Sequence, residues 1–199
     1  MPPVTLALIV ANVAVFLLQL AVPGIVIPFA LWPLGSSTSG GVSVGFEPWQ
    51  LLTYAFLHGG MLHIAFNMFA LYMFGGPVEQ VFGERRYLLY YFVCVVSAAI
   101  AQLIVSALTG TVYPSIGASG GVFGLLLAYG IYFPHTKIIL LFPPIPMPAR
   151  IFVIVYAAIE LFLGVTGTEE GVAHFAHLGG MVGGFVLLRY WRSSVRRPL

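Results

Sequence analysis

Residues 117–133 read GASGGVFGLLLAYGIYF, a run of small and apolar residues without a charged side chain. A helix of 17 such residues is roughly 26 Å long, which approaches the hydrocarbon thickness of a bilayer. The first half of the run, GASGGVFG, permits two interpretations. Small residues let membrane helices pack closely, whereas Ser119 at the centre of the motif could be a nucleophile. Packing is the commoner explanation of this motif, so other parts of the chain must decide.

The composition of the whole chain favours a membrane protein. Of its 199 residues, 60% are hydrophobic and 7% are charged, and the mean hydropathy is +1.01. A soluble domain averages about 25% charged residues. We therefore predict an all-α integral membrane protein whose residues 1–199 form a single domain. Apolar runs of helical length predict a bundle of six spans, at about residues 4–22, 60–76, 87–108, 116–133, 150–165 and 172–190.

The charged residues predict the orientation of these spans. The first run lacks the basic region and the A-x-A site of a cleaved signal, so we interpret it as a span. Under a six-span count, all eight Lys and Arg residues fall on one side of the membrane. By the positive-inside rule, both termini are cytoplasmic, and we expect a cell (inner) membrane location. The basic residues are Arg85, Arg86, Lys137, Arg150, Arg189, Arg192, Arg196 and Arg197, and the opposite side carries Glu47, Glu169 and Glu170.

The first external connection, residues 23–58, is long for a tight bundle. It contains Trp32, Trp49, four prolines and the Gly/Ser cluster SSTSGG. Tryptophan is enriched at the boundary between membrane and water. We therefore expect this loop to lie in the membrane interface rather than to be fully solvated.

Polar side chains recur at one depth in three of the predicted spans. His63 and Asn67 are four residues apart and share a helical face, Ser119 opens the fourth span, and His177 lies near the external end of the sixth. Ionisable residues inside membrane spans are costly and usually functional. We expect His174, by contrast, to contact headgroups or water and His58 to bond a loop backbone.

Glycines explain how two of these polar residues could meet. Pairs four residues apart give each of two spans a smooth face on which backbones approach closely: Gly120 and Gly124 on one, and Gly180 and Gly184 on the other. Such an approach would bring Ser119 within hydrogen-bond reach of His177. The free N–H groups at the start of the helix, together with His63 and Asn67, could stabilise an oxyanion. This combination predicts an acyl-transfer site.

The three motifs together resemble one known family. The stretches HGGMLHIAFN, GASGGVFG and AHLGGMVGG, on the second, fourth and sixth predicted spans, are similar to those of rhomboid intramembrane serine proteases of the minimal six-span bacterial type. The resemblance covers residues 46–184. It implies a serine endopeptidase that cleaves single-pass transmembrane proteins, with membrane lipids as its other partners. No cofactor, metal or nucleic acid is expected.

The resemblance also assigns roles to residues. It implies that Ser119 is the nucleophile and His177 the general base, as a dyad, and that the active site opens to the extracytoplasmic side near the outer surface. Its oxyanion donors would be His63, Asn67 and the Ser119 backbone N–H, and the fifth span would act as a lateral gate. Two departures are Gln50 after Trp49, where the family usually has Arg, and Phe123, where it often has Tyr. The supporting residues would be Gly117, Gly120, Phe123, Gly180 and Gly184.

The chain has no obvious acid to complete a triad. Its six acidic residues are all Glu, so the usual Asp is missing. We therefore expect nothing to hold the tautomer of His177 or to stabilise its cation. Loss of the Asp function costs roughly 10⁴ in kcat in a triad protease. A slow enzyme follows, selective through substrate unwinding and access more than through a deep pocket.

Other classes of protein compete with this interpretation. Four of the five histidines lie at external span ends and suggest a zinc site, but there is no HExxH motif, no Asp and no Glu close to them in helical register. A transporter would show internal repeats with broken helices, and an inactive relative would have lost Ser119 or His177. The motif also matches the G-x-S-x-G elbow of α/β-hydrolases, which requires a preceding strand in a soluble sheet.

Overall fold

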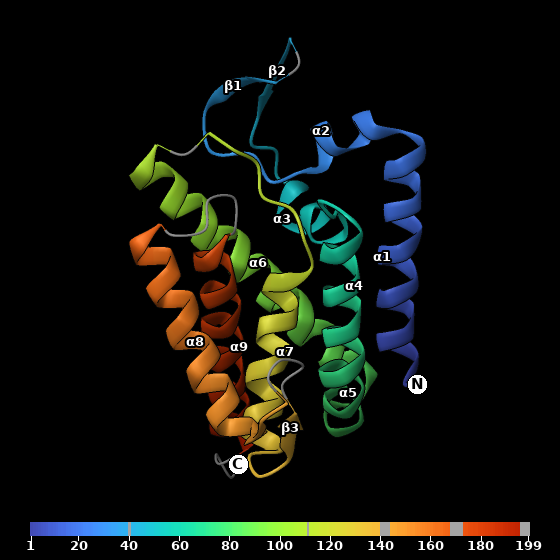
Figure 1. Ribbon diagram of the computed structural model, residues 1–199, viewed down its shortest axis with the longest axis vertical. Helices are drawn as coiled ribbons and strands as arrows, with labels where there is room; N and C mark the ends of the chain where they lie inside the picture. The colour runs from blue at the N-terminus through green and yellow to red at the C-terminus, as the bar shows by residue number, and fades with distance from the viewer. Residues whose placement is uncertain (40, 111, 140–143, 168–172, 196–199) are drawn as a thin grey trace.

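The computed structural model describes residues 1–199 except 40, 111, 140–143, 168–172 and 196–199. Most of the described chain is helical (Figure 1). The long helices are α1 (Pro3–Ala21), α4 (Met61–Ala70), α5 (Gly76–Phe82), α6 (Glu84–Thr109), α7 (Ser119–Tyr132), α8 (Ala149–Thr166) and α9 (His174–Val195). The short ones are η1 (Pro23–Ile25), α2 (Val26–Phe29), α3 (Gln50–Thr53), η2 (Tyr54–Phe56) and the π-helical turn η3 (Leu71–Gly75).

The helices have the lengths and composition of an all-α membrane protein. Within the described ranges, four are long and apolar enough to cross a bilayer: α1, the continuous helix Met61–Phe82, α6 and α8. The helix α7 is apolar but shorter. Met61–Phe82 is longer than the predicted span 60–76, because the π-helical turn η3 joins α4 to α5 without a break.

Two small hairpins were not expected from the sequence. Strands β1 (Ser36–Ser39) and β2 (Val42–Gly45) pair antiparallel and project beyond the helices (Figure 1). Strands β3 (Lys137–Ile139) and β4 (Pro146–Pro148) pair antiparallel near the opposite end of the molecule. Strands this short carry little hydrophobic periodicity, which explains why the sequence pattern did not predict them.

The two tryptophans of the loop 23–58 differ in burial. Trp32 is buried, and its Nε1–H donates to the Ile27 carbonyl at 2.7 Å. Trp32 therefore packs inside the protein, while the interfacial position expected for the loop stays a prediction. Trp49 is half-exposed, and its Nε1–H donates to the Pro28 carbonyl at 3.0 Å.

The centre of the bundle is formed by α6, α7 and α9. On α6, the side chains of Tyr87, Tyr90, Tyr91 and Cys94 are completely buried. The Tyr90 hydroxyl donates to the Gly124 carbonyl at 2.8 Å and so ties α6 to α7. Hydroxyls buried in an apolar bundle need such partners. The result is a rigid inner layer on which α7 and α9 are placed.

Glu79 of α5 holds the N-terminal end of α1. Its carboxylate accepts hydrogen bonds from the Val4 and Thr5 backbone N–H groups at 2.9 and 2.7 Å, and from the Thr5 hydroxyl at 2.7 Å. The first-turn N–H groups of a helix have no acceptor within the helix, and a negative charge there is favourable. Glu79 therefore supplies to α1 the cap that its own sequence lacks.

Replacing Glu79 with alanine is expected to destabilise the fold. A buried charged hydrogen-bond network of this kind contributes about 1–3 kcal/mol, equivalent to a lowering of the unfolding temperature by about 2–10 °C. The single thiol, Cys94, is fully buried, so a thiol-reactive dye reports unfolding in detergent. The exposed Glu84→Ala variant is the control. Equal unfolding temperatures for the two variants would contradict this role.

Candidate active site

Ser119 is the first residue of α7, and an extended segment leads into it. Ser115 pairs with Leu31 through two backbone hydrogen bonds, and the Gly117 N–H donates to the Tyr54 carbonyl at 2.9 Å. Gly117 adopts a φ of +130°, a conformation that residues with a Cβ rarely adopt. The helix begins deeper in the molecule than the upper ends of α6 and α8 (Figure 1). Ser119 therefore lies within the bundle.

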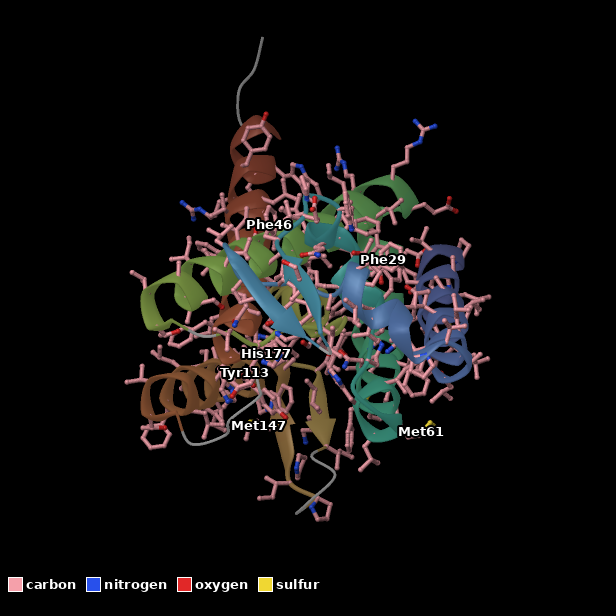
Figure 2. All side chains as sticks on the ribbon, turned by 90° about the horizontal axis from the view of Figure 1, so that it is seen from above. Phe29, Phe46, Met61, Tyr113, Met147 and His177 are labelled. Carbon is pink, nitrogen blue, oxygen red and sulfur yellow. The ribbon has the colours of Figure 1, made fainter. Side chains whose placement is uncertain are left out.

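His177 of α9 contacts Ser119 directly. Its Nε2 lies 2.8 Å from the Ser119 Oγ. The helices come this close because Gly120 of α7 faces Gly180 of α9, where a methyl group on Gly180 would overlap the Gly120 carbonyl. Seen from the hairpin side, His177 lies near the middle of the molecule (Figure 2). The structure thus joins the two residues that the sequence motifs single out.

The other two predicted glycines face a different helix. A methyl group on Gly124 would collide with the Cys94 side chain, and one on Gly184 would collide with the Tyr90 hydroxyl. Both of these side chains belong to α6. Gly124 and Gly184 therefore permit close packing on α6 more than the approach of α7 to α9.

Phe123 lies one turn after Ser119 and supports the imidazole of His177. The two rings are stacked, with centroids 4.2 Å apart and planes 4° from parallel. Because Phe123 covers a face of the imidazole, the two nitrogens at the ring edge remain available for polar partners. Phe123 therefore restricts the orientation of His177 through contact alone, without a hydroxyl.

Glu160 of α8 contacts His177 on the side away from Ser119. Its Oε2 lies 2.8 Å from the His177 Nδ1 and 2.7 Å from the His174 Nδ1. The three side chains are buried, with 7%, 9% and 5% of Glu160, His177 and His174 exposed. The expectation that no acid accompanies His177 is therefore wrong. The expectation of a slow enzyme was based on the absence of an acid, so it loses its basis.

His174 also differs from its expected position. It was predicted to contact headgroups or water, but it is buried and bonded to Glu160. The cause is the antiparallel arrangement of α8 and α9, which brings residues 14 and 17 positions apart together. One signal could have found Glu160, because it is an ionisable residue within the predicted span 150–165.

His63 is held in the form that can donate a hydrogen bond toward Ser119. The Gly59 backbone N–H donates to the His63 Nδ1 at 3.2 Å, so the proton of the neutral ring is on Nε2. A methyl group on Gly117 would lie 2.8 Å from that Nε2 and 3.7 Å from the Ser119 Oγ. The space beside the Gly117 Cα, where a side chain would otherwise lie, is therefore bounded by a hydrogen-bond donor and by the candidate nucleophile.

Asn67 lies one turn below His63 on α4 and is buried. Its Nδ2 donates to the His63 carbonyl at 2.9 Å, and in the described part of the chain no hydrogen bond links it to Ser119. An amide nitrogen carries two protons, so one remains for another acceptor. Of these two predicted oxyanion donors, His63 borders the space next to Ser119, and the hydrogen bond of Asn67 goes to the His63 carbonyl.

His58 has a structural role different from the expected one. Its backbone N–H and carbonyl bond the Gln19 side chain of α1 at 3.0 and 3.1 Å, while its ring nitrogens find no partner among the described residues. Burial, with a smaller effect of His63, lowers the pKa of His58 to about 4. The ring is therefore neutral near pH 7, and it packs against Phe16 and His63.

The three groups Glu160, His174 and His177 are close enough to be considered as metal ligands. Zinc ligands lie 2.0–2.2 Å from the ion, which places tetrahedral donors roughly 3.3 Å from one another. The Nδ1-to-Oε2 distances here are 2.7 and 2.8 Å, which are hydrogen-bond lengths. The arrangement therefore fits a proton-sharing cluster better than a metal site.

Comparisons with known proteins agree on one family over most of the chain. Residues 45–194 match the family model described as the Rhomboid domain. The chain is similar to Rhomboid protease GluP of Bacillus subtilis, with 36% identity over 70% of this chain and 25% of that protein. It is similar to RHOMBOID-like protein 4 of Arabidopsis thaliana, with 34% identity over 75% of this chain and 37% of that protein. Putative rhomboid protease YdcA of Bacillus subtilis is 29% identical over 74% of this chain and 68% of its own length. The chain thus spans about a quarter to two thirds of these relatives.

Proposed function

The chain belongs to the rhomboid family, and on that premise we propose that it is a serine endopeptidase that cleaves single-pass transmembrane proteins within the membrane. The observation that carries this proposal is the 2.8 Å contact between the Ser119 Oγ and the His177 Nε2. A hydroxyl paired with an imidazole inside an apolar bundle is the arrangement that nucleophilic acyl transfer requires. His177 is buried and Ser119 is partly buried, so the contact is partly shielded from bulk water, which strengthens it.

The proposed reaction proceeds through an acyl-enzyme. His177 Nε2 accepts the Ser119 proton as the Oγ attacks the scissile carbonyl carbon, and the carbonyl oxygen becomes an oxyanion. His177 then donates that proton to the departing amine as the C–N bond breaks. A water molecule hydrolyses the ester by the reverse proton transfers, which frees Ser119.

The oxyanion would be stabilised by donors around Gly117. His63 Nε2–H borders that space, and the Ser119 backbone N–H belongs to a helix start that no side chain caps. Asn67 would contribute its second amide proton. Fixed donors in a site shielded from water typically contribute 10²–10³-fold each to kcat.

We place this site in a six-span protein whose termini are both cytoplasmic, in the cell (inner) membrane. The eight basic residues support this orientation, and the N-terminus and the last turns of α9 lie in the half of the molecule away from the β1–β2 hairpin (Figure 1). The site would then open to the extracytoplasmic side. A substrate helix would enter from the lipid beside α8, which is the least buried of the four long apolar helices.

Labelling with a serine-reactive fluorophosphonate in detergent tests the proposed chemistry. We expect the wild-type protein to be labelled, and the Ser119→Ala and His177→Ala variants not to be labelled. Ser106→Ala is the matched control, because Ser106 is a buried serine on α6 whose hydroxyl accepts from the Gln102 Nε2. Absence of label on folded wild-type protein, or equal labelling of Ser119→Ala, would refute the proposal.

A further inference from the structure

We propose that Glu160 positions His177 for catalysis, so that Ser119, His177 and Glu160 act as a triad rather than a dyad. The inference deepens the proposed function and rests on it. Glu160 touches neither the nucleophile nor the scissile bond and acts through the imidazole. The geometry that carries it is one carboxylate oxygen within 2.8 Å of the His177 Nδ1, while the Nε2 of the same ring lies 2.8 Å from the Ser119 Oγ.

The carboxylate selects the tautomer that the reaction needs. An ionised carboxylate only accepts hydrogen bonds, so the His177 Nδ1 must carry the proton that is shared with Glu160. The lone pair of the neutral ring is then on Nε2, directed at the Ser119 hydroxyl. With the opposite tautomer, Nε2 would carry a proton and could not act as a base.

The carboxylate also stabilises the cation that forms during the reaction. When Nε2 accepts the Ser119 proton, His177 becomes an imidazolium with Nδ1–H directed at a negative charge 2.8 Å away. Attraction between opposite charges is several times stronger in a buried site than in water. Glu160 therefore lowers the energy of the charged state that accompanies the oxyanion.

His174 holds the carboxylate in place. Its Nδ1 lies 2.7 Å from the same Oε2, and within the described residues this is the only hydrogen bond of its ring. A buried ionised carboxylate is stable only if hydrogen-bond donors or charges surround it. Two imidazole N–H groups supply these donors. Of the two, only His177 is hydrogen-bonded to Ser119 in the described part of the chain, so we assign His174 to the support of Glu160.

The acid is carried by a different helix from the base. Glu160 belongs to α8, while His174 and His177 belong to α9. Gly164 of α8 packs against His174 and Phe175, where an added methyl group would lie 3.1–3.2 Å from their side chains. Displacement of α8 would therefore remove Glu160 from His177 and leave Ser119 bonded to a base without a fixed tautomer.

Kinetics of the Glu160 variants test this role with the full-length protein in proteoliposomes and a fluorogenic transmembrane peptide. We expect Glu160→Gln to lower kcat at least about 10²-fold with KM changed less than about 2-fold. The acidic limb of its pH–rate profile should move to lower pH, because protonation of His177 loses the nearby negative charge. Glu160→Asp should restore part of kcat and of the pH profile, since it returns the charge.

Two further variants keep the test decisive. Leu17→Val, at an exposed position of α1 and away from the proposed entry beside α8, is the control for substitution in a membrane helix and should retain wild-type kinetics. If Glu160→Gln does not fold by the Cys94 thiol assay, His174→Gln replaces it, with an expected loss of about 10-fold in kcat and the same direction of pH shift.

Failure of this inference is distinct from failure of the proposed function. A folded Glu160→Gln enzyme with wild-type kcat and pH profile would overturn the triad while wild-type labelling at Ser119 continued. A change in KM alone, or equal kcat for the Gln and Asp variants, would also overturn it. Loss of wild-type activity with a strong chelator would instead assign the cluster to a metal ion. Failure of wild-type protein to label or cleave would refute the protease itself.

Discussion

Replacing Ser119 with alanine is expected to abolish cleavage of a transmembrane substrate, with a loss of about 10⁶-fold in kcat. The variant keeps the helix start and the glycine contacts but lacks the oxygen that lies 2.8 Å from the His177 Nε2. Cleavage in proteoliposomes, followed by gel mobility of the two products, measures the loss.

The controls separate the nucleophile from the fold and from a metal. Ser106→Ala should cleave like the wild type, and the unfolding temperature of Ser119→Ala should remain within a few degrees of the wild type. Wild-type activity should also persist in a strong chelator. Residual cleavage by Ser119→Ala above one part in about 10³ would show that another group performs the attack.

The helices of this fold were predictable because burial in lipid leaves a strong signal. The predicted runs 4–22, 87–108 and 150–165 correspond to α1, α6 and α8 within a few residues at each end. A membrane helix must satisfy its backbone internally and present apolar side chains outward, so hydropathy alone locates it. The hairpin β1–β2 leaves no such signal, because its strands are short and rich in Ser, Thr and Gly.

A similar physical difference separates the residues of the candidate site that could be predicted from the one that was missed. The approach of Ser119 to His177 was predictable because small-residue spacing indicates which two helices come close, although only Gly120 and Gly180 of the four predicted glycines face each other. Glu160 was missed because its partners are on another helix, and a contact across 17 residues depends on the packing of α8 against α9. Helical register reports only neighbours within one helix. The acid could have been suspected from its location in a span, but not paired.

In the proposed mechanism, the oxyanion occupies the space beside the Gly117 Cα, between the His63 Nε2 and the Ser119 Oγ. A methyl group there would lie 2.8 Å from the first atom and 3.7 Å from the second. This is where the carbonyl oxygen of a substrate would be placed as Ser119 attacks. A methyl group that fills this space would exclude the oxygen on which the negative charge develops in the proposed reaction.

Gly117→Ala is therefore expected to lower kcat at least about 10³-fold, since it blocks the whole donor cluster and not a single donor. Fluorophosphonate labelling should fall in parallel, because the phosphoryl oxygen of the probe occupies the same space. The φ of +130° at Gly117 adds backbone strain of about 1–3 kcal/mol to the alanine variant. Gly110→Ala separates the two effects, because Gly110 has a φ of +72° with open space around it. We expect this control to lose stability and keep activity. Wild-type labelling of Gly117→Ala would mean that the oxyanion is bound elsewhere, and that His63 has no part in the reaction.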